Sequence, residues 1–235
     1  MGKFVDVHSH VLPGVDDGIQ SLGECIASLK EYERLGFGNV FCTSHQKQYS
    51  INPEIETLKQ VYEAVCDENP TGIKLHTGAE NYFDDQFLGR LRRTEVPVLG
   101  NSQYFLFELP PTIPVRHLDR IVYEMSLSGY MPVLAHIERY PWLKLEEIKS
   151  IRNNIIISAN ITTLLKKLTP VDKQKRLIKL LKLDYIDIFT TDLHSYDFFP
   201  GIEKAINWAY KNLGDDVVEK LLVENPMKIV NDAEK

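Results

Sequence analysis

The chain has 235 residues, of which 43% are hydrophobic and 26% are charged, and these values are typical of a globular protein. Its formal net charge of −6 argues against general attraction to nucleic acid, and an anionic substrate would need bound cations to reverse the field locally. No apolar run approaches the ~18 residues that a membrane-spanning helix needs.

Three cysteines, Cys25, Cys42 and Cys66, form no Cys-x-x-Cys pair, and their odd number argues against a disulfide framework. The chain begins directly with a strand pattern instead of a secretory signal. We therefore expect a reduced, cytoplasmic protein that meets a membrane only indirectly, through a partner.

Short apolar runs alternate with amphipathic segments along the chain. The first predicted helix ends at Gly36, and Pro53 opens the second. The predicted elements, in chain order, are strand 4–7, helix 22–35, strand 39–42, helix 53–68, strand 73–77, strand 104–107, helix 114–128, strand 132–135, strand 155–158, helix 170–182, strand 186–190, helix 201–212 and more helix to the end. Seven β/α units in one run predict an α/β fold with a parallel sheet, closed as a barrel, in a single domain over residues 1–235.

The first predicted strand carries two histidines on one side. His8 and His10 are two residues apart on an extended segment, so both imidazoles point to the same face. They lie at its carboxyl end, where barrel enzymes place their chemistry. This pair can therefore coordinate one metal ion.

Most of the other predicted strands also lead into His, Asp or Glu. Because the carboxyl ends of barrel strands share one rim, residues far apart in sequence converge there. Carboxylates and imidazoles without cysteine suit Mn²⁺, Fe²⁺, Zn²⁺ or Mg²⁺, and the donors are too many for one ion. The residues concerned are Asp16, Asp17, His45, Glu80, Glu108, His136, Asp192 and His194.

Each of these residues has a plainer explanation when taken alone. Asp16-Asp17-Gly18 is the composition of a turn, and a single His45 after a strand is more often structural. The repetition at equivalent strand ends favours a metal site of two or three clustered ions. His76, within a strand, and His117, within a helix, are expected to be structural.

Arg139 follows His136 by three residues on the same predicted loop. Its planar guanidinium can hold a phosphate or a carboxylate through two parallel hydrogen bonds. The alternative is a surface salt bridge to Glu138 or Glu147.

The opening of the chain, Asp6-Val7-His8-Ser9-His10 followed by Asp16-Asp17-Gly18, resembles that of bacterial PHP-type (polymerase and histidinol phosphatase) protein-tyrosine phosphatases. These are manganese-dependent enzymes of capsule and exopolysaccharide loci. The resemblance covers nearly the whole chain, because that family's later motifs are matched in order by Thr43-Ser44-His45, Gly78-Ala79-Glu80, Ala135-His136-Ile137-Glu138-Arg139-Tyr140 and Thr191-Asp192-Leu193-His194.

This resemblance implies a distorted (β/α)7 barrel of the PHP type with a trinuclear metal site. Manganese is the expected metal, with iron, zinc or magnesium as alternatives. Arg139 would bind phosphate, with Asp17 and Asp192 beside it in catalysis, and the general acid is left open between Asp17 and a bound water. The metal ligands carried over from the family are His8, His10, Asp17, His45, Glu80, Glu108, His136, Asp192 and His194.

The implied substrate is phosphotyrosine on the tail of a bacterial tyrosine kinase, and the sequence leaves the oligomeric state open. One position departs from the family, which usually has a second phosphate-binding arginine before a proline past the last ligand. Here Phe199 precedes Pro200. The exchange predicts weaker phosphate binding or an aromatic face for the leaving group. Lys47 is a candidate to compensate.

Three alternative functions can be compared with these residues. A cysteine phosphatase is excluded because no cysteine begins a Cys-x5-Arg loop: the residues in the arginine position are Glu31, Gln48 and Gly72. A small-molecule phosphatase of the same superfamily, similar to histidinol-phosphate phosphatase, would have a similar metal site. A non-catalytic metal-binding adaptor is suggested by the Phe199 departure, although every expected ligand is present.

Overall fold

The computed structural model describes residues 2–166 and 168–235. Within these residues the strands all pair in parallel, which confirms the predicted α/β class. They are β1 (Phe4–Ser9), β2 (Phe37–Cys42), β3 (His45–Gln46), β4 (Lys74–Thr77), β5 (Glu80–Tyr82), β6 (Tyr104–Glu108), β7 (Met131–Leu134), β8 (Ile156–Asn160) and β9 (Ile188–Thr190).

The strands form a curled sheet in two parts. One part has the order β1-β2-β4 and the other has the order β3-β5-β6-β7-β8-β9. Two residues separate β2 from β3, and two separate β4 from β5, so both parts continue each other. At the other edge, an isolated parallel bridge joins Ser9 at the end of β1 to Leu193 just past β9. The carboxyl ends of all strands therefore face the same side.

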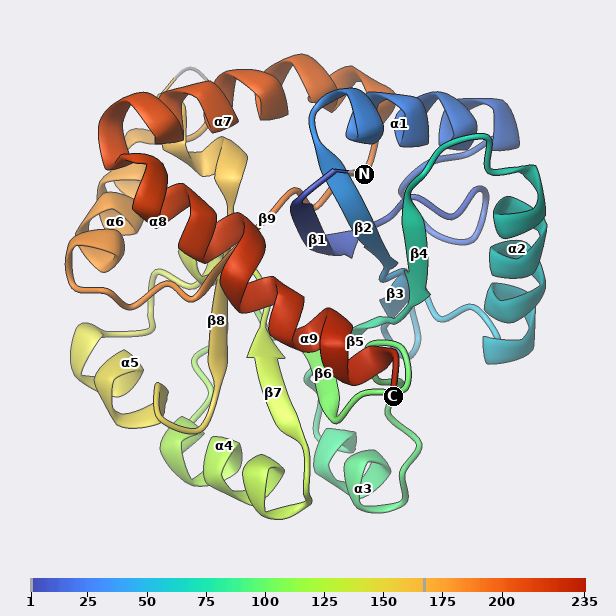
Figure 1. The fold of residues 1–235 in the computed structure, drawn as a ribbon. Helices are drawn as coiled ribbons and strands as arrows, with labels where there is room; N and C mark the ends of the chain where they lie inside the picture. The colour runs from blue at the N-terminus through green and yellow to red at the C-terminus, as the bar shows by residue number, and fades with distance from the viewer. Residues whose placement is uncertain (1, 167) are drawn as a thin grey trace.

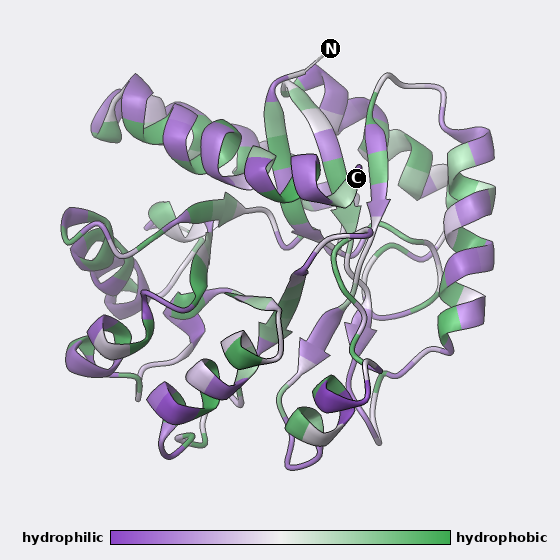
Figure 2. Cartoon of the chain, turned by 60° about the horizontal axis from the view of Figure 1, so that its bottom comes forward, coloured by the Kyte–Doolittle hydropathy of each residue, from purple (hydrophilic) through white to green (hydrophobic). Residues whose placement is uncertain are grey.

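The helices lie outside the curled sheet, except for the last ones, which cross in front of it in Figure 1. In Figure 2 hydrophilic and hydrophobic residues alternate along the outer helices, as expected for helices with one buried face. The α-helices are α1 (Leu22–Arg34), α2 (Ile55–Glu68), α3 (Phe87–Arg92), α4 (Leu118–Leu127), α5 (Leu145–Ile151), α6 (Val171–Lys182), α7 (Phe199–Leu213), α8 (Asp215–Glu219) and α9 (Asn225–Ala233). Three 3-10 turns, η1 (Ile137–Arg139), η2 (Ile161–Leu164) and η3 (Tyr196–Phe198), follow strand ends, and a π-helical stretch, η4 (Lys220–Glu224), joins α8 to α9.

Most predicted elements are present, with shifted ends. The helix predicted over 114–128 begins only at Leu118, because His117 adopts a left-handed conformation with φ 56°. Two helices, α3 and α5, were missed, since six and seven residues are too few to show a helical period. The strands β3 and β5 were missed because two and three residues are too few to show the alternation of a strand. No helix among residues 2–166 and 168–235 has the length and apolar character needed to cross a bilayer.

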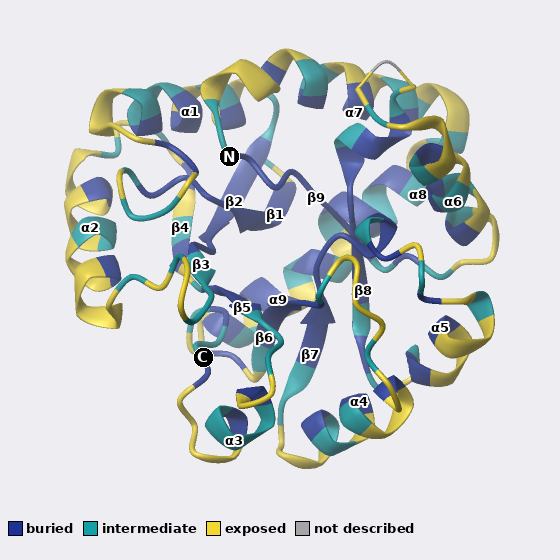
Figure 3. Ribbon diagram, turned by 180° about the vertical axis from the view of Figure 1, so that it is seen from behind, coloured by how far each residue is buried: buried dark blue, intermediate teal, exposed yellow. Residues whose placement is uncertain are grey.

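The inner face of the sheet carries an apolar core that includes Val7, Phe41, Leu106 and Val133. Residues of α9 pack into this core, and the amide of Gln103, which leads into β6, donates to Asp232 (3.0 Å). The last helix therefore covers the amino ends of the strands. Figure 3 shows most of the strand residues as buried, with exposed residues in β4. The opposite, carboxyl ends of the strands are left to form a site.

Asp6 ties the first strand to the last. Its buried carboxylate accepts hydrogen bonds from the hydroxyl of Tyr32 (2.8 Å) and the amide of Thr191 (3.1 Å), and from the Thr191 hydroxyl. Burial raises the pKa of Asp6, while these hydrogen bonds act in the opposite direction. The network links β1, α1 and the segment after β9 in the interior.

Replacing Asp6 with alanine should lower the free energy of unfolding by about 3 kcal/mol, because the buried donors of Tyr32 and Thr191 lose their acceptor. Urea unfolding of the purified protein at neutral pH measures this loss. The matched control is Tyr32→Phe, which removes one donor and leaves the carboxylate in place, at a cost of about 1 kcal/mol. Equal stability of the two variants would contradict the role given to Asp6.

Candidate metal centre

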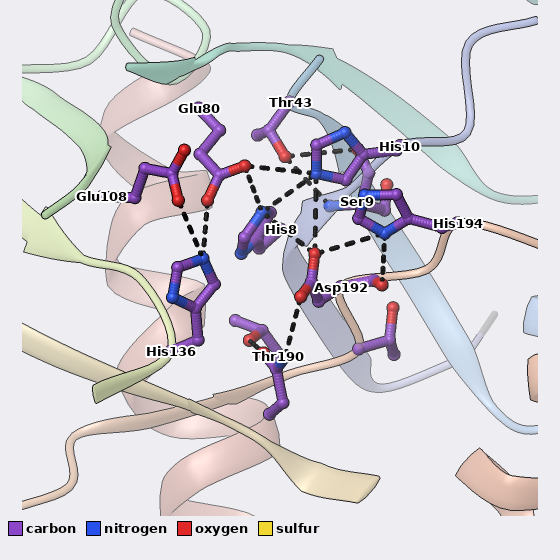
Figure 4. A network of polar contacts seen from close by, with 12 residues as sticks. His8, Ser9, His10, Thr43, Glu80, Glu108, His136, Thr190, Asp192 and His194 are labelled. Atoms are coloured by element: carbon purple, nitrogen blue, oxygen red, sulfur yellow. Dashed lines mark hydrogen bonds and ion pairs between the residues drawn. The ribbon is translucent and has the colours of Figure 1, made fainter. Parts of the chain in front are cut away.

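Nine ionisable side chains meet at the carboxyl ends of the strands, and Figure 4 shows those of His8, His10, Glu80, Glu108, His136, Asp192 and His194. They come from β1, from the loop after β1, from β3, β5 and β6, and from the segments after β7 and β9. They are the same nine that the sequence predicts as ligands: His8, His10, Asp17, His45, Glu80, Glu108, His136, Asp192 and His194. His76 and His117 lie outside the groups these residues form.

The nine residues form four overlapping groups in which the ligand atoms all lie within 4.8 Å of one another. His8, His10, His45 and Glu80 each belong to two groups, so the groups make one connected array. The groups are His8 with Glu80 and His136; His8 with His10 and Asp192; His45 with Glu80 and Glu108; and His10 with Asp17, His45 and His194.

The centre of this array has the spacing of a cation site. Nε2 of His8 lies 3.2 Å from Nε2 of His10, and Oε2 of Glu80 lies 3.5 Å and 3.4 Å from these two atoms. Oδ1 of Asp192 lies 3.5 Å from each. Donors about 2.1 Å from one ion, at tetrahedral or octahedral angles, lie about 3.0–3.4 Å from each other.

Two oxygen atoms at this centre have no hydrogen-bond partner although they are buried. They are Oε2 of Glu80 and Oδ1 of Asp192. A buried carboxylate oxygen without a partner costs free energy, unless a cation supplies the missing interaction. The donor set therefore fits one or more divalent ions, and imidazole with carboxylate suits manganese, iron or zinc.

Glu80 also contacts His136 on its other side. The Oε1 atom of Glu80 lies 2.7 Å from Nε2 of His136, and Oε2 of Glu108 lies 3.9 Å from that nitrogen. Burial and the charge of Arg139 lower the pKa of His136 to about 4, so its ring is neutral near pH 7, the form that binds metal. Burial and the Glu80 charge raise the pKa of Glu108 to about 7.

The outer corner of the array faces solvent. The Oδ1 atom of Asp17 lies 3.3 Å from Nε2 of His45 and 3.6 Å from Nε2 of His194. The Asp17 side chain is 56% exposed, whereas those of His8 and His10 are fully buried. The array is therefore open to solvent on the side of Asp17.

Asp16 contributes to the array as a partner of His10 and not as one of the nine donors. Its Oδ2 atom lies 2.8 Å from Nδ1 of His10 and accepts the amide of His45 (3.1 Å), and its Oδ1 atom accepts the amide of Gly18 (3.0 Å). Burial alone would raise the pKa of Asp16, but the interaction with His10 lowers it to about 2. A Cβ atom at Gly18 would lie 2.3 Å from the His10 carbonyl, so only glycine lets this loop pack so closely. Asp16 thus orients His10 from behind.

Two further residues support the array and were missed. The hydroxyl of Tyr140 lies 3.2 Å from Nδ1 of His136 and accepts the amide of Leu109 (3.0 Å). The side-chain amide of Asn160 donates to Oδ2 of Asp192 (2.8 Å). Asn160 ends β8, so the rule that strand ends carry the site could have found it. Tyr140 lies within the matched motif at residues 135–140, but the sequence gives no sign that it supports His136.

Two of the nine residues have left-handed backbones. His136, after β7, has φ 33°, and Asp192, after β9, has φ 54°. Such a conformation costs a non-glycine residue on the order of 1 kcal/mol and persists where the surroundings enforce it. Both side chains turn into the array, as Figure 4 shows. The local backbone strain is thus tied to the direction of these two donors.

Arg139 lies at the edge of the array, in η1. Its Nη2 atom forms an ion pair with Oδ2 of Asp192, and its side chain is 37% exposed. The predicted alternative, a surface salt bridge to Glu138 or Glu147, is wrong among the described residues. The guanidinium is therefore partly open to solvent directly beside the donors.

The prediction that Phe199 offers an aromatic face to the leaving group is wrong, whereas weaker phosphate binding stays a prediction. Phe199 is 2% exposed and packs edge-on against Tyr32 with ring centroids 5.1 Å apart, so it offers no face to a ligand. The side chain that is open to solvent is that of Phe198, which is 48% exposed.

Nζ of Lys47 lies 4.4 Å from the centre of the Tyr82 ring. The charge of Lys47 lowers the pKa of Glu108, against the effect of burial. Lys47 is thus a basic group on the rim of the array.

Solved structures with a similar fold include metal-dependent enzymes. The crystal structures of YwqE from Bacillus subtilis and CpsB from Streptococcus pneumoniae, described as metal-dependent tyrosine phosphatases, match with a TM-score of 0.77, 21% identity and coverage of 98% of this chain and 92% of that one. The lactonase Lmo2620 from Listeria monocytogenes matches with a TM-score of 0.66 and 11% identity over 97% and 94% of the two chains. These likenesses confirm the curled parallel α/β fold.

Relatives by sequence agree with the structural match. The tyrosine-protein phosphatase CpsB of Streptococcus pneumoniae is 31% identical over 97% of this chain and 99% of its own length. The tyrosine-protein phosphatase CpsB of Streptococcus agalactiae is 25% identical over 97% and 98%. The family model for capsular polysaccharide synthesis, CpsB/CapC, matches residues 4–231. The chain therefore belongs to the CpsB/CapC family.

Proposed function

We propose that this chain is a metal-dependent phosphoester hydrolase, a protein-tyrosine phosphatase that acts on the phosphotyrosine tail of a capsule or exopolysaccharide tyrosine kinase. The observation that carries the proposal is the array of nine imidazole and carboxylate donors with Arg139 at its edge. The relatives named as tyrosine-protein phosphatases, which this chain matches over nearly its whole length, support the substrate class. Such a substrate places the protein in the cytoplasm.

The proposal includes the architecture. With β2 and β3 counted as one strand, and β4 and β5 as another, the sheet has seven strand positions, and the Ser9–Leu193 bridge joins the first to the last. This count supports a distorted (β/α)7 barrel of the PHP type, in a single domain over residues 1–235. In such a barrel the carboxyl rim holds the site.

In this proposal the nine residues of the array hold two or three divalent ions, with manganese as the expected metal and iron, zinc or magnesium as alternatives. Bound divalent ions activate water for attack on phosphorus and offset the charge of the phosphate. His8, His10, Glu80 and Asp192 hold the central position, where the two buried oxygens without partners point.

The chain's own side chains then position the phosphate. Arg139 provides planar donors for two phosphate oxygens and stabilises charge that develops on them. Asp192 keeps Oδ1 towards the histidines, while its Oδ2 is held by Asn160 and Arg139. The tyrosine leaving group has a pKa of about 10, so a proton donor assists its departure without being essential. That donor is a bound water or Asp17, on the exposed side; in the second case the other eight residues of the array hold the ions.

The structure offers no support for a thiol nucleophile. Burial raises the pKa of Cys25 to about 12 and raises the pKa of Cys42 well above its usual value. Cys66 lies on the exposed side of α2, and partial burial also raises its pKa. A reactive cysteine needs a lowered pKa, so attack by a bound water fits these residues better.

Chelation should abolish hydrolysis of a phosphotyrosine peptide, and added Mn²⁺ should restore it, because the buried donors cannot bind phosphate without cations. Phosphate release, measured together with metal content, tests this outcome, and histidinol phosphate serves as the competing substrate. Fully metal-loaded protein that turns over no phosphoester would contradict the proposal and favour an adaptor. A higher rate on histidinol phosphate would favour a small-molecule phosphatase.

Replacing Arg139 with alanine should reduce turnover of a phosphotyrosine peptide by about 10²-fold, because the contacts to phosphate are lost. It should leave the metal content unchanged, because Asn160 still holds Oδ2 of Asp192 when the ion pair with Arg139 is gone. Steady-state kinetics with elemental analysis of the same samples tests this separation. His136→Ala should lose both metal and activity, and Arg120→Ala, on the outside of α4, should lose neither. Full activity of Arg139→Ala would remove the residue from the mechanism.

Replacing Asp16 with alanine should weaken metal binding by about 10–100-fold, because His10 loses the carboxylate that orients its ring. Calorimetric titration of the metal-free protein with Mn²⁺ measures the change. Asp67→Ala, an exposed residue of α2, is the matched control and should bind as the unaltered protein does. Unchanged affinity of Asp16→Ala would show that His10 needs no such support.

A further inference from the structure

A groove of about 920 Å³ lies beside the proposed centre, between the segments that follow β8 and β9. One wall comes from η2 and the residues after it, including Thr162 and Leu168. The other comes from η3 and the outer side of α7, including Phe198, Lys204 and Trp208. Its volume is at the upper end of the ~300–1,000 Å³ of ligand pockets, and exceeds what a phosphotyrosine side chain alone fills.

Both walls begin at residues of the centre. The η2 turn follows Asn160, whose side chain holds Asp192, and the η3 turn begins two residues after His194. The two walls are in contact where the Leu168 side chain lies against Gly201. A Cβ atom built at Gly201 would lie only 2.9 Å from Cδ1 of Leu168. One end of the groove, at Thr162 and Asp197, is therefore two and three residues along the chain from Asn160 and His194, and the groove extends along α7 to Asn212.

The surface of the groove includes exposed apolar side chains that do not pack in the core. Phe198 is 48% exposed and Leu168 is 57% exposed, while the next residue, Phe199, is almost fully buried. In Figure 3 the outer face of α7 and the segments beside it are exposed. Large apolar side chains that gather next to a reactive centre mark a surface that binds a partner.

The charges along the groove favour an acidic partner. Lys166 and Lys204 line it, against a single acidic residue, Asp197. The described lining thus has a local excess of one positive charge, on a chain with a net charge of −6. It attracts acidic residues, and the apolar side chains between the lysines suit an apolar residue of the same segment.

We propose that this groove docks the extended polypeptide on either side of the phosphotyrosine, with an apolar residue on Phe198 and Leu168 and an acidic residue beside Lys204. The proposal rests on the proposed phosphatase function and adds a sequence preference to it. The occupant is a segment of the substrate protein, because the groove begins a few residues along the chain from the centre, at Thr162 and Asp197, carries more positive than negative charge and is larger than the phosphorylated side chain.

Two synthetic phosphopeptides test the groove: one with leucine and glutamate on both sides of the phosphotyrosine, and one with glycine and serine there. The metal-loaded protein should prefer the first. Phe198→Ala should raise its KM for the leucine–glutamate peptide by about fivefold, with kcat unchanged, and should remove the preference between the peptides. Lys204→Glu should raise the same KM by about fivefold at low salt and less at high salt.

Matched controls lie elsewhere on the surface. Leu127→Ala removes an exposed leucine of α4, and Lys59→Glu reverses an exposed charge of α2, away from the groove; neither should alter the preference. Turnover of p-nitrophenyl phosphate, which has no flanking residues, should be the same in all four variants. A preference that survives both Phe198→Ala and Lys204→Glu would overturn the docking proposal and leave the phosphatase function intact.

Failure of the phosphatase function is recognised separately. In that case the metal-loaded protein cleaves neither peptide, and fluorescence anisotropy with the labelled leucine–glutamate peptide decides the role of the groove. Weaker binding by Phe198→Ala than by Leu127→Ala would support docking without hydrolysis. Equal binding by the two variants would overturn it.

Discussion

The rest of the structure depends on the burial of two carboxylates, Glu80 and Asp192, beside His8 and His10. Each carboxylate turns one oxygen towards the two imidazoles and leaves it without a hydrogen bond. Burial of this kind is stable only with a compensating positive charge at the same place. The fold meets this demand by bringing donors from both ends of the chain to a single rim, where a divalent ion can balance them.

The surrounding residues hold these donors in place. Asp16 supports His10, and Asn160 supports Asp192, in each case through a hydrogen bond to the atom that faces away from the centre. The left-handed backbone at His136 and Asp192 is a further constraint, because it turns the chain sharply after a buried strand. The apolar interior below the rim and the helix α9 at the other end make this arrangement rigid.

The donors were predictable from the sequence because each follows an apolar run, and the carboxyl ends of parallel strands converge. The supporting residues were harder to find. Asp16 and Asp17 are neighbours of the same type, and only their packing separates a buried partner of His10 from an exposed donor. For the same reason the sequence could not tell that Phe199 belongs to the core and that its neighbour Phe198 faces solvent. Burial is set by tertiary contacts, which carry no local signal.

The link between the first strand and the segment after β9 has a consequence for synthesis of the protein. Asp6 meets Thr191, which is made 185 residues later, and β1 gains its second neighbour only through Leu193. A nascent chain that stops before this point has His8 and His10 but none of the support from the far end. Folding must therefore wait for the last fifth of the chain to leave the ribosome, since such distant contacts form late. Until then, the early part presents unpaired strand edges to the cell.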